Sequence, residues 1–143
     1  ESLKLVYKNE DLTLVHGTLD APEEFHYMTD TYIAQESFKL LENNICFIGH
    51  SHVAGVFVND KDGPIYYQEV DYIDIKDENK YIINVGSVGQ PRDDNPQSAY
   101  CIYDTSKKEV QIKRISYDIQ TTRGKIIEAG LPRFLGDRLL IGK

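Results

Sequence analysis

The chain has 143 residues, 41% of them hydrophobic, which is enough to bury a core and excludes a disordered chain. No apolar stretch approaches the ~20 residues needed to cross a bilayer, and no signal-peptide pattern is visible. The formal net charge of −7 counts against bulk nucleic-acid binding, although a local basic spot can still recognise one phosphate. Cys46 and Cys101 lie in apolar runs and are interpreted as reduced core residues, which indicates a cytoplasmic protein.

The first third of the sequence predicts a hairpin followed by a helix. Short β-rich runs over residues 3–7 and 12–17 flank the polar turn KNED, which is typical of a β-hairpin. A stretch over residues 29–43 has a partial apolar stripe at helical spacing and is expected to stop at Asn43-Asn44.

The rest of the chain is dominated by predicted strands and closes with two helices. The β-rich runs lie at residues 45–49, 53–58, 64–70, 72–76, 81–89, 98–104 and 109–118. The first of them, ICFIG, is almost continuously apolar, as expected of a strand covered on both faces. Helices are predicted over 119–129 and 133–140. This order indicates an α/β or α+β layered sandwich.

Histidines at strand ends are the main chemical signal. His16 ends one predicted strand, and His50 and His52 directly follow Gly49 at the end of another. Strand ends in a layered α/β fold converge on a crevice, and residues two apart on an extended backbone point the same way. Imidazole is a good ligand for Zn, Mn, Fe and Ni, and a glycine permits close approach of a ligand. A lone histidine is usually a polar residue with its hydrogen bonds satisfied and no role as a ligand, and we interpret His26 in that way.

Three histidines are an incomplete hydrolytic site. A two-metal site needs a bridging group, normally a carboxylate, and Asp20 is the nearest candidate, although nothing in the sequence places it between two ions. A structural zinc site is a weaker alternative. Cys46 shares a strand face with His50 but lies ~13 Å away along the strand, so we discount it.

A glycine-serine loop follows the predicted strand that begins at residue 81. Backbone N–H groups in NVGSVGQPR, residues 84–92, can face an oxyanion, and the planar guanidinium of Arg92 can pair with a phosphate. The alternative is a tight loop in which the glycines supply only positive φ and Arg92 pairs with Asp93 or Asp94.

Taken together, these motifs resemble one known family. VHG at 15–17, GHSH at 49–52, NVGSVGQPRDDNP at 84–96 and the tail from residue 114 resemble the calcineurin-like metallophosphoesterase superfamily. Within this superfamily, the motifs most resemble the bacterial and archaeal phosphodiesterase branch, which is often described as diadenosine-tetraphosphatase-like. The resemblance implies a four-layer fold of mixed β-sheets flanked by helices. It also implies a centre of two divalent ions, Mn, Fe, Zn or Ni, that hydrolyses phosphoesters.

The resemblance also implies roles for individual residues. His16 and His50 resemble ligands of the second metal, and His52 resembles a ligand of the first. Gly49 would let the strand end pack against the cluster. The substrate pocket would be lined by Asn84, Gly86, Ser87 and Arg92.

Three motifs that precede these in the family are not found in the sequence: Asp-x-His, Gly-Asp, and Gly-Asn-His-Asp or Glu. Gly136-Asp137 is a Gly-Asp pair in the wrong place. We therefore expect residues 1–143 to be the C-terminal portion of a single metallophosphoesterase domain, without its N-terminal metal-binding half and inactive alone. The absence of an initiator methionine at Glu1 agrees with a fragment. Such a fragment is expected to expose apolar strand edges, which the missing half or a second copy would cover.

Two functions from different classes follow. The first is part of a phosphoesterase or phosphodiesterase that acts on a phosphoester small molecule or nucleotide, with no membrane partner. The second is a non-catalytic scaffold or interaction module on the same fold. The natural substrate, whether nucleotide phosphodiester, dinucleoside polyphosphate or phosphoprotein, stays open, as does homo-oligomerisation.

Overall fold

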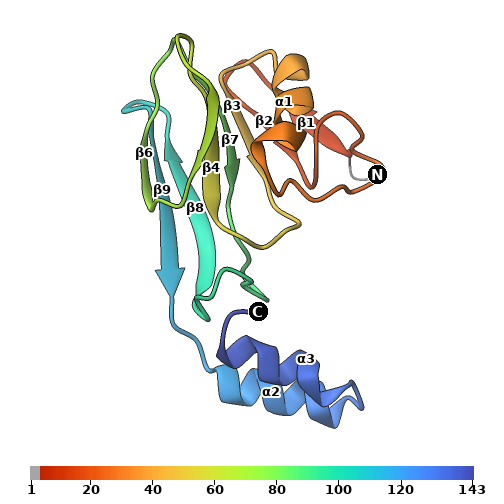
Figure 1. The fold of residues 1–143 in the computed structure, drawn as a ribbon. Helices are drawn as coiled ribbons and strands as arrows, with labels where there is room; N and C mark the ends of the chain where they lie inside the picture. Colours follow the sequence, from red (N-terminus) through yellow and green to blue (C-terminus); the bar gives the residue numbers. More distant parts are fainter. Residues whose placement is uncertain (1–3) are drawn as a thin grey trace.

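The computed structural model describes residues 4–143, which form two β-sheets and a small number of helices (Figure 1). The six-stranded sheet has the order β1 (Val6–Lys8), β2 (Thr13–Val15), β3 (Ile45–Ile48), β7 (Lys80–Asn84), β4 (Gly55–Asn59) and β5 (Ile65–Gln68). The three-stranded sheet has the order β6 (Tyr72–Asp74), β9 (Glu109–Ile115) and β8 (Ser98–Asp104). The predicted mixed α/β architecture is confirmed.

The edge of the six-stranded sheet where β2, β3 and β7 end carries the candidate site. β2 pairs with β3 in parallel, and β3 pairs with β7 in parallel. Parallel strands finish at the same edge, so the segments that follow residues 15, 48 and 84 start side by side. β3 is buried along its whole length, which confirms that it is covered on both faces.

Two apolar clusters lie on the two faces of the six-stranded sheet. On one face, α1 (Thr31–Leu40) buries Ala34 and Phe38 against Cys46 and Ile82. On the other, the side chains of β3, β4 and β7 pack against the three-stranded sheet through a cluster that includes Val110. Helix α1, the six-stranded sheet and the three-stranded sheet therefore stack as three layers.

Helix α1 is shorter than predicted at both ends. The Asp30 carboxylate accepts the N–H groups of Tyr32 and Ile33 at 2.9 and 3.0 Å, so it caps the helix and fixes its start at Thr31. At the other end Leu41 is already extended, with φ −72° and ψ 112°, and its side chain is buried in the core. Burial of Leu41 therefore ends the helix before Asn43-Asn44.

The C-terminal helices lie beyond the end of β9 (Figure 1). They are α2 (Ile119–Glu128), α3 (Arg133–Asp137) and the 3₁₀ turn η1 (Arg138–Leu140), so the single helix predicted over 133–140 is divided. Arg123 Nε donates to Asp137 Oδ1 at 2.6 Å. A Cβ at Gly136 would lie 2.9 Å from Arg123 Cγ, so Gly136-Asp137 joins the two helices and takes no part in the site.

An apolar groove of about 450 Å³ opens between the two sheets. Its walls include Leu14 and Phe47 from the larger sheet and Cys101 and Tyr103 from β8, and it reaches His16. The predicted hairpin is confirmed for β1 and β2, while residue 3 of the first run lies outside the described residues. Within residues 4–143, no helix is both long enough and apolar enough to cross a membrane.

Candidate metal centre

His16 and His50 meet at the ends of β2 and β3. His50 Nδ1 lies 3.0 Å from His16 Nε2. The Gly49 N–H donates to the His16 carbonyl at 3.0 Å, which fixes the two strand ends in register. The convergence predicted for these two histidines is therefore present. A Cβ at Gly49 would lie 3.9 Å from His16 Nδ1, which is an ordinary van der Waals contact. Packing within this structure therefore does not require a glycine at position 49.

The sequence predicted that His50 and His52 point the same way if the backbone stays extended. The backbone after Gly49 is not extended. Both residues have left-handed conformations, with φ of 64° and 63°. Non-glycine residues rarely adopt this region, and such outliers cluster at functional sites. The chain thus places these imidazoles through two successive turns and not through strand alternation.

The 3.0 Å between His16 Nε2 and His50 Nδ1 is a hydrogen-bond distance, and the ring tautomers decide which nitrogen donates. It is also about the separation of two neighbouring nitrogens ~2.1 Å from one octahedral ion, ~3.0 Å, and is shorter than the ~3.4 Å of a tetrahedral site. His52 Nδ1 lies 2.8 Å from the Gln90 carbonyl oxygen, which can only accept a proton. Its Nε2 is then the free ligand atom, and this carbonyl-to-histidine orientation is typical of metal-binding histidines.

These side chains form a partial ligand set. Nowhere in residues 4–143 do three His, Cys, Asp or Glu side chains gather closely enough to hold a metal ion by themselves. Asp20 does not bridge the histidines, because its carboxylate accepts the Ser37 hydroxyl at 3.0 Å beside α1. Cys46 is buried in the apolar cluster between α1 and the six-stranded sheet, and burial raises the pKa of its thiol to about 12. His26 is exposed on the loop before α1.

Local electrostatics favour neutral imidazoles. Partial burial lowers the pKa of His50, the neighbouring His16 lowers it further, and hydrogen bonding to the Phe25 backbone opposes both effects. Burial also lowers the pKa of His52, against the opposing hydrogen bond to Gln90, and Arg92 lowers the pKa of both histidines. Both shifts favour the neutral imidazole, which keeps a free lone pair on one ring nitrogen.

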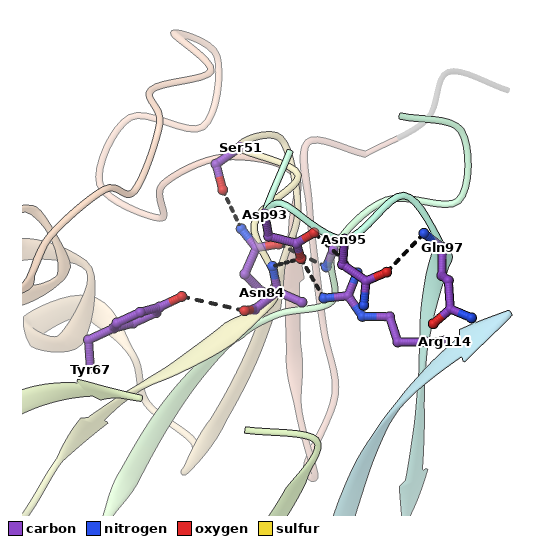
Figure 2. A network of polar contacts seen from close by, with 9 residues as sticks. Ser51, Tyr67, Asn84, Asp93, Asn95, Gln97 and Arg114 are labelled. Atoms are coloured by element: carbon purple, nitrogen blue, oxygen red, sulfur yellow. Dashed lines mark hydrogen bonds and ion pairs between the residues drawn. The ribbon is translucent and has the colours of Figure 1, made fainter. Parts of the chain in front are cut away.

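Asn84 supports the turn that carries His50. Its Nδ2 donates to the Gly49 carbonyl at 2.9 Å and to Ser51 Oγ at 2.7 Å, and its Oδ1 accepts the Gly86 N–H at 3.0 Å. Figure 2 shows the bond to Ser51. The side chain is only 2% exposed. The structure therefore places Asn84 beneath the site as a brace, while its predicted substrate contact stays a prediction.

Gly86 and Ser87 shape the loop that follows β7. Gly86 has φ 77°, and a Cβ there would lie 2.7 Å from the Ala99 Cβ, so glycine is required for both conformation and packing. The Ser87 carbonyl accepts the Ala99 N–H at 2.8 Å, and its hydroxyl accepts the Gln90 N–H at 2.9 Å. The loop thus delivers Gln90 to His52.

Arg92 does not pair with either neighbouring aspartate, so that part of the alternative is wrong, although the positive φ that it expected is present at Gly86. Its Nε and Nη2 donate to Gln90 Oε1 at 3.2 and 2.9 Å, and its N–H donates to the His52 carbonyl at 3.1 Å. Asp93 instead pairs with Arg114, as Figure 2 shows, and Asp94 pairs with Lys143. The guanidinium of Arg92 is therefore held on the side of the loop that carries the histidines.

Asp93 anchors the same loop from below. Its Oδ2 accepts the Ala54 N–H at 3.1 Å, and its Oδ1 accepts from Arg114 Nη1 at 3.2 Å (Figure 2). Both side chains of the ion pair are mostly buried. The pair fastens the loop to β9 and to the segment just before β4, which fixes the position of His52 relative to Arg92.

Sequence reasoning missed three residues that lie at the site. Gln90 holds His52 through its backbone and Arg92 through its side chain. The Tyr27 ring stacks on His50 with centroids 4.3 Å apart and an interplanar angle of 16°. The Phe25 ring meets His16 edge to face at 5.9 Å. The only local signal was the pair of aromatic residues in the polar loop that follows His16.

Comparisons with known proteins agree with this picture. The model of the calcineurin-like phosphoesterase superfamily domain matches residues 1–108. The uncharacterized protein MJ0912 of Methanocaldococcus jannaschii is 35% identical over 136 residues, which cover 95% of this chain and 54% of that protein. The chain therefore spans about half the length of this relative.

Two solved structures resemble the whole chain. A crystal structure of a metallophosphoesterase from Sphaerobacter thermophilus is 32% identical, with a TM-score of 0.85, and the match covers 99% of this chain and 60% of that one. The hypothetical protein PH1004 from Pyrococcus horikoshii OT3 is 15% identical, with a TM-score of 0.67 and coverage of 97% and 50%. The second likeness concerns the fold alone.

Proposed function

Because the chain belongs to the calcineurin-like phosphoesterase superfamily, we propose that it supplies part of the active site of a metal-dependent phosphodiesterase. The observation that carries the proposal is the pair of imidazole nitrogens 3.0 Å apart at adjoining strand ends. His52, oriented by the Gln90 carbonyl, adds a third nitrogen nearby. The proposed ligands are thus His16 and His50 for one divalent ion and His52 for a second.

The proposed cofactors are two ions of Mn, Fe, Zn or Ni, all of which imidazole binds well. When bound, such ions polarise phosphoryl oxygens and make a nearby water more acidic. The chain's own contribution is positioning. The turns at His50 and His52 aim the nitrogens, and Asn84 and Gln90 fix those turns. The guanidinium of Arg92, held by Gln90, would neutralise charge on the phosphoester.

The remaining ligands are proposed to come from polypeptide outside residues 1–143. The relatives are nearly twice as long as the region they share with this chain, which leaves room for further ligands and a bridging carboxylate. The apolar groove beside His16 is a surface that such a segment would cover. On this proposal residues 1–143 are one portion of a single domain and hydrolyse little phosphoester alone.

The alternative proposal is a non-catalytic scaffold on the same fold. It draws support from the fact that residues 4–143 contain no complete three-residue metal cluster. The two proposals differ in what the gene-encoded protein does with a metal ion, because a scaffold needs neither metal affinity nor hydrolysis.

The test compares His50→Ala with a matched histidine control. The gene-encoded protein, with its native flanking sequence, is assayed for Mn²⁺ binding and for hydrolysis of bis(p-nitrophenyl) phosphate with Mn²⁺ or Ni²⁺. We expect His50→Ala to lower the rate by at least about 100-fold, since even residues that only support a ligand change activity by about 10- to 100-fold. His26→Ala, at an exposed histidine of the neighbouring loop, is expected to leave the rate unchanged. Equal rates for the protein and His50→Ala would exclude the assignment.

A further inference from the structure

Two hydrogen-bond donors from separate loops meet beside His50. The ring of Tyr27 is stacked on the His50 imidazole, and its hydroxyl lies 3.5 Å from Arg92 Nη1. Tyr27 remains 45% exposed. A phenol and a guanidinium therefore face solvent together at the edge of the candidate metal centre.

Both donors are held in place by other contacts. Gln90 Oε1 binds the Nε and Nη2 of Arg92, which leaves Nη1 turned toward Tyr27. On the other side, the loop that carries Tyr27 is pressed against the end of β2. A Cβ at Gly17 would lie 2.8 Å from the His26 carbonyl oxygen, so only glycine allows this approach.

The segment just before Tyr27 also shows backbone strain. Phe25 has φ 52°, a conformation that costs free energy for a bulky aromatic residue. Its ring lies beside the His50 imidazole, with ring centroids 6.1 Å apart. The fold thus maintains a strained turn that sets Tyr27 against His50.

The charge on Arg92 is not compensated locally. Within residues 4–143 its guanidinium forms no ion pair, because the adjacent Asp93 and Asp94 are paired with Arg114 and Lys143. The Tyr27 hydroxyl can accept from Arg92 and still donate its own proton. Two donors 3.5 Å apart, one of them cationic, can share one anionic oxygen.

We propose that Tyr27 and Arg92 form an anion clamp that binds a non-bridging phosphoryl oxygen of the phosphodiester beside His50. This inference rests on the proposed function and adds Tyr27 to it as a substrate-contact residue. The ligand class is a phosphoester anion or inorganic phosphate. The stacking on His50 positions the ring, and the hydroxyl makes the contact.

The experiment separates the hydroxyl from the ring. Tyr27→Phe keeps the stacking surface and removes only the hydroxyl, whereas Tyr27→Leu removes both. Tyr32→Phe is the matched control, because Tyr32 lies on α1 and is 82% exposed. The gene-encoded protein and its variants are loaded with Mn²⁺, metal content is measured, and inorganic phosphate is titrated calorimetrically. Hydrolysis of bis(p-nitrophenyl) phosphate is followed separately.

We expect Tyr27→Phe to weaken phosphate binding about tenfold, the usual effect of losing one hydrogen bond to a charged group, with metal content unchanged. Tyr32→Phe is expected to bind phosphate as the parent does. Unchanged phosphate affinity in Tyr27→Phe, or no phosphate binding by the parent, would overturn the clamp. So would a loss seen in Tyr27→Leu alone, which would make Tyr27 a positioning residue for His50.

The clamp and the proposed function fail in different ways. If Tyr27→Phe weakens phosphate binding and no ester is hydrolysed, the clamp stands and the phosphodiesterase proposal fails. If the ester is hydrolysed at the same kcat/KM by parent and Tyr27→Phe, and phosphate binding is also equal, the phosphodiesterase stands and the clamp fails.

Discussion

Asn84→Ala is expected to destabilise the fold and loosen the turn that carries His50. The substitution deletes three hydrogen bonds, to the Gly49 carbonyl, Ser51 Oγ and the Gly86 N–H. A buried hydrogen bond contributes about 1 kcal/mol net, and a buried group left unpaired costs more. The expected loss in the free energy of unfolding is therefore about 3 kcal/mol. For a chain of this length that corresponds to a fall in Tm of about 10 °C.

Asn79→Ala is the matched control, because Asn79 is a buried asparagine that immediately precedes the same strand, β7, at the end opposite Asn84. Its Oδ1 accepts the Lys61 N–H at 3.1 Å, and its Nδ2 donates to Asp60 Oδ2 at 3.4 Å. Its removal is expected to cost about 2 kcal/mol by the same reasoning. The two variants are thus expected to lose similar amounts of stability, but they loosen opposite ends of β7.

Two measurements separate the variants. Urea unfolding followed by circular dichroism gives the free energies, and amide hydrogen exchange reports on the Gly86 N–H. We expect Gly86 to exchange faster in Asn84→Ala, beyond the change in global stability, but to keep its local protection in Asn79→Ala. A loss below about 1 kcal/mol in Asn84→Ala, or equal Gly86 protection in the two variants, would refute the assignment of Asn84 as the brace of the turn.

Two further outcomes follow from the structure. Gly17→Ala is expected to lose about 1–3 kcal/mol in urea unfolding, because the new Cβ would meet the His26 carbonyl 2.8 Å away; unchanged stability would contradict this close approach. Arg123 holds the pKa of Asp137 below its ordinary value of 3.8, so this carboxylate stabilises the fold fully above that value and ceases to do so as pH falls through the lower folded-state pKa. Asp137→Asn should therefore lower Tm at pH 7 but not at a pH below the folded-state pKa, and a pH-independent difference between the two proteins would count against the Arg123–Asp137 contact.

Local patterns predicted most of the elements correctly. The continuous apolar run of β3, the turn residues between β8 and β9, and the glycine after α2 all act through neighbouring residues, so they can be read in sequence order. Boundaries were predicted less well where a tertiary contact decided them. Burial of Leu41 ended α1 early, and the packing of Gly136 on Arg123 accompanies the division of the last helix.

The sequence by itself determined the resemblance to the family, the order of strands and helices, and the meeting of His16 with His50, since each depends on short motifs and on which residues end neighbouring strands. Only the tertiary structure decided how the site is held. The Gln90 carbonyl reaches His52 across 38 residues, and Arg92 reaches Tyr27 across 65. It also showed that His50 and His52 leave the extended conformation, which a strand pattern could not reveal. Such contacts depend on loops brought together by parallel strand pairing, and no local propensity encodes which loops will meet.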